Sequence, residues 1–292
     1  MSVHMSVAAS TGTASLSASQ VAQFQRDGYL IVPQLFDPTQ IAEIRDTFMA
    51  TASDGPVDGL SEGRQSLNRG GSAQYAPSDP LSFYPRMMHP HSHPDKPVGP
   101  LSMKYMLHPR FEPILRQLLA GEPVAVQSMF YFKPPGARGQ ALHQDNFYLR
   151  VKPGTCLAAW VAIDDADEEN GAIQCVSNTA SHPIQCPQSA DLSESFTTEH
   201  VAPPPGSRIE LVPLQAGDVL LFNGNVIHGS GPNRSATRFR RALIFHYVAR
   251  GTVELSSWYR TPLRFNAELL SIADAAGGGP CGGSEHFAPG PH

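Results

Sequence analysis

The sequence predicts a mainly β fold braced by a few helices. After Val124 the chain breaks into short runs rich in strand-forming residues, with turns but no amphipathic helix between them. Before this point, three segments carry the capping residues or the apolar spacing of helices. Strands at such density indicate a sandwich or a jelly roll. The double-stranded β-helix, which is the cupin type of jelly roll, has a mouth in which metals are held.

Capping residues place the first two helices. Ser17 and Gln20 form a capping box, and the helix that it opens stops at Gly28, before a first strand at residues 29–32. Asp37 caps the second helix, whose first turn begins with proline. One face of this helix is apolar and carries Ile41, Ile44 and Phe48.

The third helix has the clearest apolar spacing and ends at Gly121. The residues that share its apolar face are Phe111, Ile114, Leu115, Leu118 and Leu119. The predicted strands then span residues 125–132, 155–163, 172–176, 208–212, 219–222 and 242–248. The three helices are expected to brace the sheet that these strands form.

The chain is predicted to form one domain at residues 17–265. With 292 residues, of which 41% are hydrophobic, it can bury a single large core. Residues 1–16 are expected to be a disordered tail, and residues 266–292 a flexible segment rich in Gly and Pro. Two long stretches, residues 55–100 and 181–207, lack periodicity. We predict that 55–100 is a lid over the metal mouth, with hinges at Gly59, Gly63, Gly70 and Gly71.

Composition excludes several classes of protein. A net charge of −5 argues against a nucleic-acid partner, which would call for a basic face. No stretch approaches the roughly 18 apolar residues of a membrane span, and residues 1–14 lack the pattern of a signal peptide. We therefore expect a cytoplasmic protein that acts on a small molecule.

The four cysteines lack any Cys-x-x-Cys pair, so neither a zinc site nor a disulfide framework is expected. We interpret them as free thiols, and Cys156 and Cys175 as inert residues of buried strands. We interpret His89, His91 and His93 as parts of a flexible polar loop, in preference to a second metal site.

Three residues have the spacing of an iron site. His143-Gln144-Asp145 is followed 85 positions later by His228. Because side chains alternate along a strand, His143 and Asp145 project from the same face and Gln144 points away. One more imidazole completes a 2-His-1-carboxylate set, which leaves one side of the metal open, as in non-heme Fe(II) oxygenases. With 12 histidines in the chain, an accidental match is the alternative for this motif taken alone.

A cationic residue follows the second histidine of this set. Arg240 lies twelve residues beyond His228, where the predicted strand 242–248 begins. A guanidinium there lies near a dry sheet interior, and its planar fork suits a carboxylate. The alternative is that Arg238, Arg240 and Arg241 are solvated residues at a strand end.

Six segments carry a resemblance to a known family. In chain order they are Lys133-Pro134-Pro135-Gly136, residues 143–148 (HQDNFY), residues 159–165 (AWVAIDD), Glu169-Asn170-Gly171, Gly217-Asp218 and residues 228–233 (HGSGPN). Their order and types resemble the phytanoyl-CoA dioxygenase family of Fe(II)/2-oxoglutarate oxygenases. The resemblance runs from about residue 20 to about residue 248, which is most of the chain.

The resemblance implies a role for eight residues. It makes His143, Asp145 and His228 the iron ligands. It makes Arg240 and Ser230 the partners of the distal carboxylate of 2-oxoglutarate, with Arg238 as the alternative to Arg240. Met129 and Trp160 would flank the cosubstrate, and Gln127 would share that wall.

The resemblance also implies the cofactors and the reaction. Fe(II), 2-oxoglutarate and O2 would convert an unactivated C–H bond of a small-molecule or acyl substrate to an alcohol, releasing succinate and CO2. Asp145 favours hydroxylation, because related halogenases lack this carboxylate; desaturation and ring formation are the alternatives. Two other classes are open: a cupin-type metal enzyme that needs neither Arg240 nor Ser230, and a non-catalytic binding module on the same barrel.

Overall fold

The computed structural model describes residues 15–62, 75–259, 261–275 and 281. Its α-helices are α1 (Ala18–Asp27), α2 (Pro38–Thr51), α3 (Val98–Met106), α4 (Phe111–Leu118) and α5 (Asp145–Leu149), with short 3-10 helices η1 (Pro80–Ser82) and η2 (Pro90–Ser92). Ser17 and Asp37 cap α1 and α2 with complete capping boxes, as predicted, and the Gly28 cap of α1 is left-handed.

Most strands belong to two sheets. The larger, seven-stranded sheet has the order β1-β10-β5-β12-β3-β14, with β2 also paired to β3; the smaller has the order β4-β11-β6-β9. The strands of the larger sheet are β1 (Tyr29–Val32), β10 (Val219–Asn223), β5 (Leu157–Ala162), β12 (Ala242–Ala249), β3 (Pro123–Tyr131), β14 (Leu263–Arg264) and β2 (Met87–Met88). The smaller sheet has β4 (Gln140–His143), β11 (His228–Ser230), β6 (Ile173–Val176) and β9 (Ile209–Val212). Outside them lie β7 (Gln188–Ser189), β8 (Glu199–His200), β13 (Glu254–Leu255) and β15 (Ala273–Asp274).

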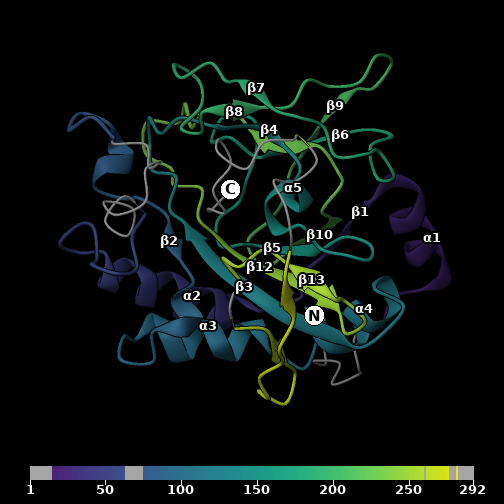
Figure 1. Cartoon of the computed structure of the whole chain (residues 1–292). Coiled ribbons are helices and arrows are strands. Elements are labelled where there is room, and N and C mark those ends of the chain that lie inside the picture. The colour runs from purple at the N-terminus through teal and green to yellow at the C-terminus, as the bar shows by residue number, and fades with distance from the viewer. Residues whose placement is uncertain (1–14, 63–74, 260, 276–280, 282–292) are drawn as a thin grey trace, which may run out of the picture.

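The two sheets and the helices form layers. Figure 1 shows α2 and α3 beneath the large sheet and the smaller sheet on its other side. One core cluster joins the helices to the large sheet, for example through the stacked rings of Phe48 and Phe130, whose centroids are 3.9 Å apart. A second cluster, which includes Met129, Trp160 and Ile173, fills the space between the sheets. These three residues also line a cleft between the sheets.

Most predicted elements are present. The three predicted helices correspond to α1, α2 and α4, and each predicted strand overlaps an observed one within a few residues. The sequence patterns missed α3, which begins inside the irregular stretch 55–100, the short helix α5, and short strands such as β11 and β13. We did expect a strand at His143, where β4 ends. Short strands carry too few residues for an alternating pattern to be recognised.

The ends of the predicted domain can be compared with the described residues. Leu16, which we placed in the N-terminal tail, is buried, and its backbone bonds to the side chain of Gln117 in α4. Residues 1–14 lie outside the described residues, as do Gly63, Gly70 and Gly71 of the predicted hinges. The predicted C-terminal segment contains β15, which pairs with β13.

The prediction of four free cysteines is wrong. Cys186 and Cys281 form a disulfide across 95 residues, with their Cα atoms 5.5 Å apart. Neither residue belongs to a spacing motif, so only the folded chain brings them together. Cys156 and Cys175 are free and buried, as predicted.

No helix in the described part of the chain has the length and apolar content needed to cross a membrane.

Candidate active site

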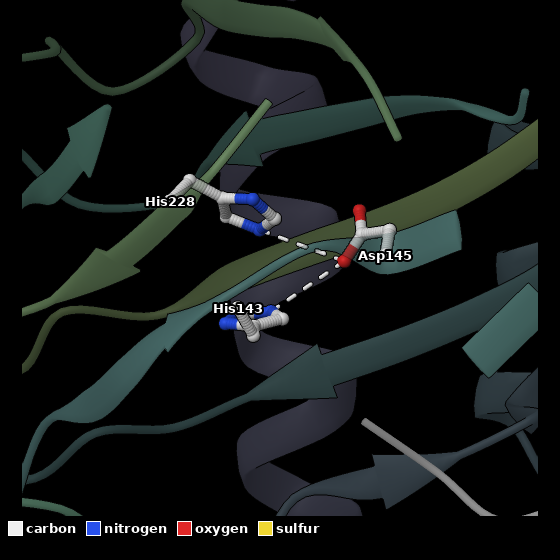
Figure 2. A group of neighbouring side chains, drawn as sticks. All are labelled: His143, Asp145 and His228. Carbon is white, nitrogen blue, oxygen red and sulfur yellow. Dashed lines mark ion pairs between the residues drawn. The ribbon is translucent and has the colours of Figure 1, made fainter. Parts of the chain in front are cut away.

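His143, Asp145 and His228 converge in the space between the two sheets. The Nε2 atoms of His143 and His228 lie 3.5 and 3.6 Å from Oδ1 of Asp145. Figure 2 shows the three side chains pointing toward one another. All three are buried, and theirs is the one cluster of metal-ligand type found among the described residues. The predicted triad is therefore assembled in space.

The pairing of two short strands brings the histidines together. His143 ends β4 and lies directly opposite His228 in β11. Asp145 is not on a strand, contrary to our prediction, because the chain turns at Gln144 into the short helix α5. Gln144 itself has the extended conformation, so the side chain of Asp145 still emerges beside that of His143.

Gln144 points away from the triad, as predicted, and has a structural role there. Its side-chain nitrogen donates to the carbonyl of Asn225 at 2.8 Å, and its oxygen accepts from the backbone of Gln185 at 2.8 Å. Gln144 thus links the chain between His143 and Asp145 to the turn before His228 and to the loop that carries Cys186.

The hydrogen bonds of the imidazoles fit a metal site. Nδ1 of His143 lies 2.9 Å from the carbonyl of Ala141, and Nδ1 of His228 lies 3.0 Å from that of Val226. A proton on each Nδ1 leaves the Nε2 lone pair to face the centre of the cluster. Burial lowers the pKa of His228 to about 4, so this ring is neutral at pH 7. Two imidazoles and one carboxylate are a donor set that suits Fe(II).

Gln140 and His246 also contact the triad. The side-chain amide of Gln140 lies 3.2 Å from Nε2 of His143, on the lone pair that a metal ion would take. Nε2 of His246 lies 3.0 Å from Oδ2 of Asp145. We did not predict either residue. His246 lies in a run of strand residues, and the sequence carries no sign that its ring meets a carboxylate 101 positions away.

A cleft opens beside the triad. Its lining includes four of the residues predicted to contact 2-oxoglutarate, namely Met129, Trp160, Ser230 and Arg240. Gln127 is fully buried and is not part of this lining, although its cross-strand partner His246 is.

The structure separates Arg240 from Arg238. Arg240 is 3% exposed, stacks over Trp160 with its guanidinium carbon 5.3 Å from the ring centre, and reaches Ser230 Oγ at 3.4 Å. Arg238 instead forms ion pairs with Asp167 and Glu169 at the surface. Of these two arginines, Arg240 lines the cleft and Arg238 does not.

A buried lysine lies behind this part of the cleft. Nζ of Lys133 donates to Ser230 Oγ at 2.8 Å and to the carbonyl of Gly171 at 3.3 Å. Burial, reinforced by the charge of Arg240, holds the pKa of Lys133 well below its usual value. Lys133 belongs to one of the motifs quoted above, but we gave it no role.

The histidines of the irregular stretch are packed, which corrects our prediction of a flexible loop. His91 is buried, and its Nδ1 lies 2.6 Å from Ser128 Oγ. His89 lies against Trp258, with ring centroids 5.8 Å apart. Burial lowers the pKa of His89 to about 3 and that of His91 to about 4. Among the described residues, the one cluster of metal-ligand type does not include these histidines.

Comparison with known proteins identifies the family. The family model described as phytanoyl-CoA dioxygenase matches residues 24–242, which is more than half of the chain. This chain belongs to the phytanoyl-CoA dioxygenase family. It is therefore a 2-oxoglutarate-dependent dioxygenase that uses iron, and the family predicted from the six motifs is confirmed.

Two relatives match this chain over different lengths of sequence. The chain is 28% identical to phytanoyl-CoA dioxygenase domain-containing protein 1 of Rattus norvegicus, over 82% of this chain and 93% of the rat protein. It is 29% identical to phytanoyl-CoA dioxygenase 1 of Oryza sativa, but this match spans 52% of the chain and only about half, 54%, of the rice protein.

A solved structure confirms the predicted fold. The epimerase SnoN from nogalamycin biosynthesis, in complex with Fe3+, alpha ketoglutarate and nogalamycin RO, superimposes with a TM-score of 0.58 at 21% identity. The match covers 89% of this chain and 95% of SnoN. At this identity the likeness shows the fold of the family, a double-stranded β-helix with added helices, and does not extend to the substrate.

Proposed function

We propose that this dioxygenase hydroxylates an unactivated C–H bond of a small-molecule or acyl substrate, with release of succinate and CO2. The observation that carries the proposal is the meeting, in one cleft, of a buried 2-His-1-carboxylate cluster with the buried guanidinium of Arg240. A metal enzyme of other cupin chemistry would need the first of these features but not the second.

In this proposal His143, Asp145 and His228 hold the iron. Their nitrogen and oxygen atoms lie within 4.8 Å of one another, and the Nδ1 bonds keep both Nε2 lone pairs directed inward. The bound iron, with 2-oxoglutarate and O2, would supply the oxidising chemistry. The protein's own contribution is to hold three ligands on one side and to leave the other side to the reactants.

Arg240, Ser230, Trp160 and Met129 would hold the cosubstrate. Arg240 offers a planar pair of donors to the distal carboxylate, and Trp160 fixes that plane by stacking. Ser230 lies beside the guanidinium and would add a third donor. Met129 and Trp160 supply an apolar wall that keeps water from these charges. Gln127, next to this wall, keeps its predicted role as a weaker candidate contact.

Asp145 supports hydroxylation as the outcome. Its carboxylate occupies the third protein position, which related halogenases leave to chloride. The primary substrate would enter beside the triad, and the packed walls of the cleft would orient its C–H bond. Desaturation or ring formation would need the same residues, and the mass of the product distinguishes them from hydroxylation.

The lid at residues 55–100 is also part of the proposal. Within its described part, Arg86 forms an ion pair with Glu62 at 2.7 Å and donates to the hydroxyl of Tyr131 at 2.6 Å. Tyr131 lines the cleft, so this pair fastens the segment to the cleft wall. Glu62→Gln should loosen it and raise the amount of succinate formed without primary substrate. An unchanged rate would contradict the lid.

A titration tests the proposed cofactor site. Anaerobic protein is mixed with Fe(II) and 2-oxoglutarate, separately and together, while the weak visible charge-transfer band is recorded. The band should require both additions in the native protein. Its absence with both, or its presence with Fe(II) alone, would refute the site. A mass-spectrometric screen of small molecules with 2-oxoglutarate present then identifies the substrate.

A further inference from the structure

Two cations lie side by side behind the cleft. Lys133 is 4% exposed and Arg240 is 3% exposed. The same two neutral oxygens accept from both: Gly171 O lies 3.3 Å from Lys133 Nζ and 3.1 Å from Arg240 Nε, while Ser230 Oγ lies 2.8 Å from Lys133 Nζ and 3.4 Å from Arg240 Nη2. The cations are therefore bridged by a carbonyl and a hydroxyl.

This arrangement lacks a negative charge. Among the described residues, no carboxylate forms an ion pair with Lys133 or Arg240, whereas Arg86, Arg138 and Arg241 nearby each have one. Two buried like charges bridged only by neutral acceptors are unfavourable. Burial lowers the pKa of both side chains, that of Arg240 to about 10. An anion bound at this end of the cleft would balance them.

Ser230 connects Lys133 to the cleft. Lys133 does not line the cleft, whereas Ser230 does. The oxygen of Ser230 accepts from Lys133 Nζ, and more weakly from Gln140 N at 3.4 Å and Arg240 Nη2. A hydroxyl has two lone pairs and one proton. The three neighbours are all donors and share these two lone pairs, so none of them accepts the proton of Ser230, which is left for a partner in the cleft.

The backbone holds Lys133 in this place. Its φ is +40°, in the left-handed region that a lysine rarely adopts. Its carbonyl accepts from Arg240 N at 3.1 Å and from Asn233 Nδ2 at 3.0 Å, so the two cations are also joined through the main chain. Gly171 leaves room for the ammonium group, because a Cβ there would lie 3.0 Å from Lys133 Nζ.

We infer that Lys133 is a positioning residue for the cosubstrate. It makes Ser230 a hydrogen-bond donor toward the cleft and adds a second positive charge behind Arg240. The cleft thereby selects 2-oxo acids whose far end is an anion. This inference rests on the proposed function, because it assumes that the 2-oxo acid binds the iron beside Arg240.

A pair of ligands tests the inference. The Kd of 2-oxoglutarate and of 2-oxovalerate, which has a methyl group in place of the distal carboxylate, is measured by calorimetry on anaerobic Fe(II) protein. Lys133→Met keeps the length of the side chain without its charge. We expect it to weaken 2-oxoglutarate binding by about ten- to a hundredfold, as for a lost hydrogen bond network to a charged group. The Kd of 2-oxovalerate should change less than about twofold, because that ligand lacks the carboxylate that the bond serves.

Two further variants separate the mechanism from a loss of structure. In a Ser230→Ala background, Lys133→Met should raise the Kd of 2-oxoglutarate by a factor several-fold smaller than in the native background, because part of the effect of Lys133 passes through the Ser230 hydroxyl. Lys133→Arg should recover part of the affinity, and Lys104→Met, at an exposed lysine, should change nothing. Equal loss for both ligands, or no loss for either, overturns the inference; so does an undiminished loss in the Ser230→Ala background.

The experiment also distinguishes this inference from the proposed function. If native protein fails to bind 2-oxoglutarate with Fe(II), the proposed function fails, and the inference with it. If native protein binds it and Lys133→Met binds it equally well, only the inference fails. If Lys133→Met does not fold, Lys133→Arg compared on the two ligands decides: a changed ratio of the two Kd values supports the role, and an unchanged ratio overturns it.

Discussion

Nε2 of His246, on β12 of the large sheet, lies 3.0 Å from Oδ2 of Asp145, which follows β4 of the small sheet. The other carboxylate oxygen, Oδ1, faces Nε2 of both His143 and His228. The two oxygens thus have separate partners. A bond to Oδ2 restrains rotation of the carboxylate and keeps Oδ1 directed toward the metal position.

Loss of this bond should weaken iron binding. We expect His246→Phe, which keeps a ring but removes the donor, to lower iron affinity by about 10- to 100-fold, as is typical for partners of metal ligands. His246→Gln, which retains an N–H donor, should recover part of the loss. Iron binding is measured anaerobically by competition with a chelator. His108→Phe, in the helical layer, is the control, and equal affinity in His246→Phe and native protein would contradict the role.

Removal of an imidazole from the triad should abolish iron binding. His143→Ala and His228→Ala each leave two ligands, too few to retain the metal geometry. Both variants should lose iron and 2-oxoglutarate turnover together, measured by metal analysis and succinate formation. Asp145→Ala should lose hydroxylation while keeping weaker metal binding. Stoichiometric iron in either histidine variant would show that the ligands lie elsewhere.

Arg240 and Arg238 should differ sharply in their effect on the cosubstrate. Breaking a buried charge pair costs about 2 to 5 kcal/mol, so Arg240→Ala should raise the Kd of 2-oxoglutarate by more than tenfold. Arg240→Lys should restore only part of the affinity for 2-oxoglutarate, since an ammonium group cannot reproduce the paired donors of a planar guanidinium. Arg238→Ala is the matched control, because its guanidinium is paired at the surface. Similar Kd values for the two alanine variants would place the carboxylate elsewhere.

The packed histidines should make the fold sensitive to acid. Burial, and then the charge of neighbouring histidines, lowers the pKa of His89 to about 3. Unfolding restores a value near 6.5, so the unfolded chain takes up the proton first. This contribution to stability is complete above about pH 6.5 and falls by about 1.4 kcal/mol per pH unit down to the folded pKa.

Replacing His89 should therefore flatten the acid limb of the stability curve. Urea unfolding of metal-free protein between pH 7 and pH 4 measures it. His89→Phe should lose less stability over this interval than native protein does, while His200→Phe, at a partly exposed position, should follow the native curve. Parallel curves for His89→Phe and native protein would show that this ring does not govern the response.

Much of the fold was readable in local patterns. The capping boxes at Ser17 and Asp37 place two helices, because a cap is satisfied by residues only three positions away. Runs rich in strand-forming residues mark the long strands β3 and β12, which are buried along nearly their whole length. The triad was also predictable, since two of its members are neighbours in sequence and the third lies in a recognisable motif.

Other features arise from contacts between distant segments. His246 meets Asp145, and Cys186 meets Cys281, across 101 and 95 residues. No local spacing encodes these pairs. The difference between Arg240 and Arg238 is of the same kind: both are arginines at the start of one strand, and only the packing of Trp160 and Ser230 around the first makes it a buried site for an anion. The local sequence around each residue therefore determined the helices, the strands and the types of metal ligand. Which residues are buried and which distant residues pair was decided only by the tertiary structure, because both depend on how all the elements pack together.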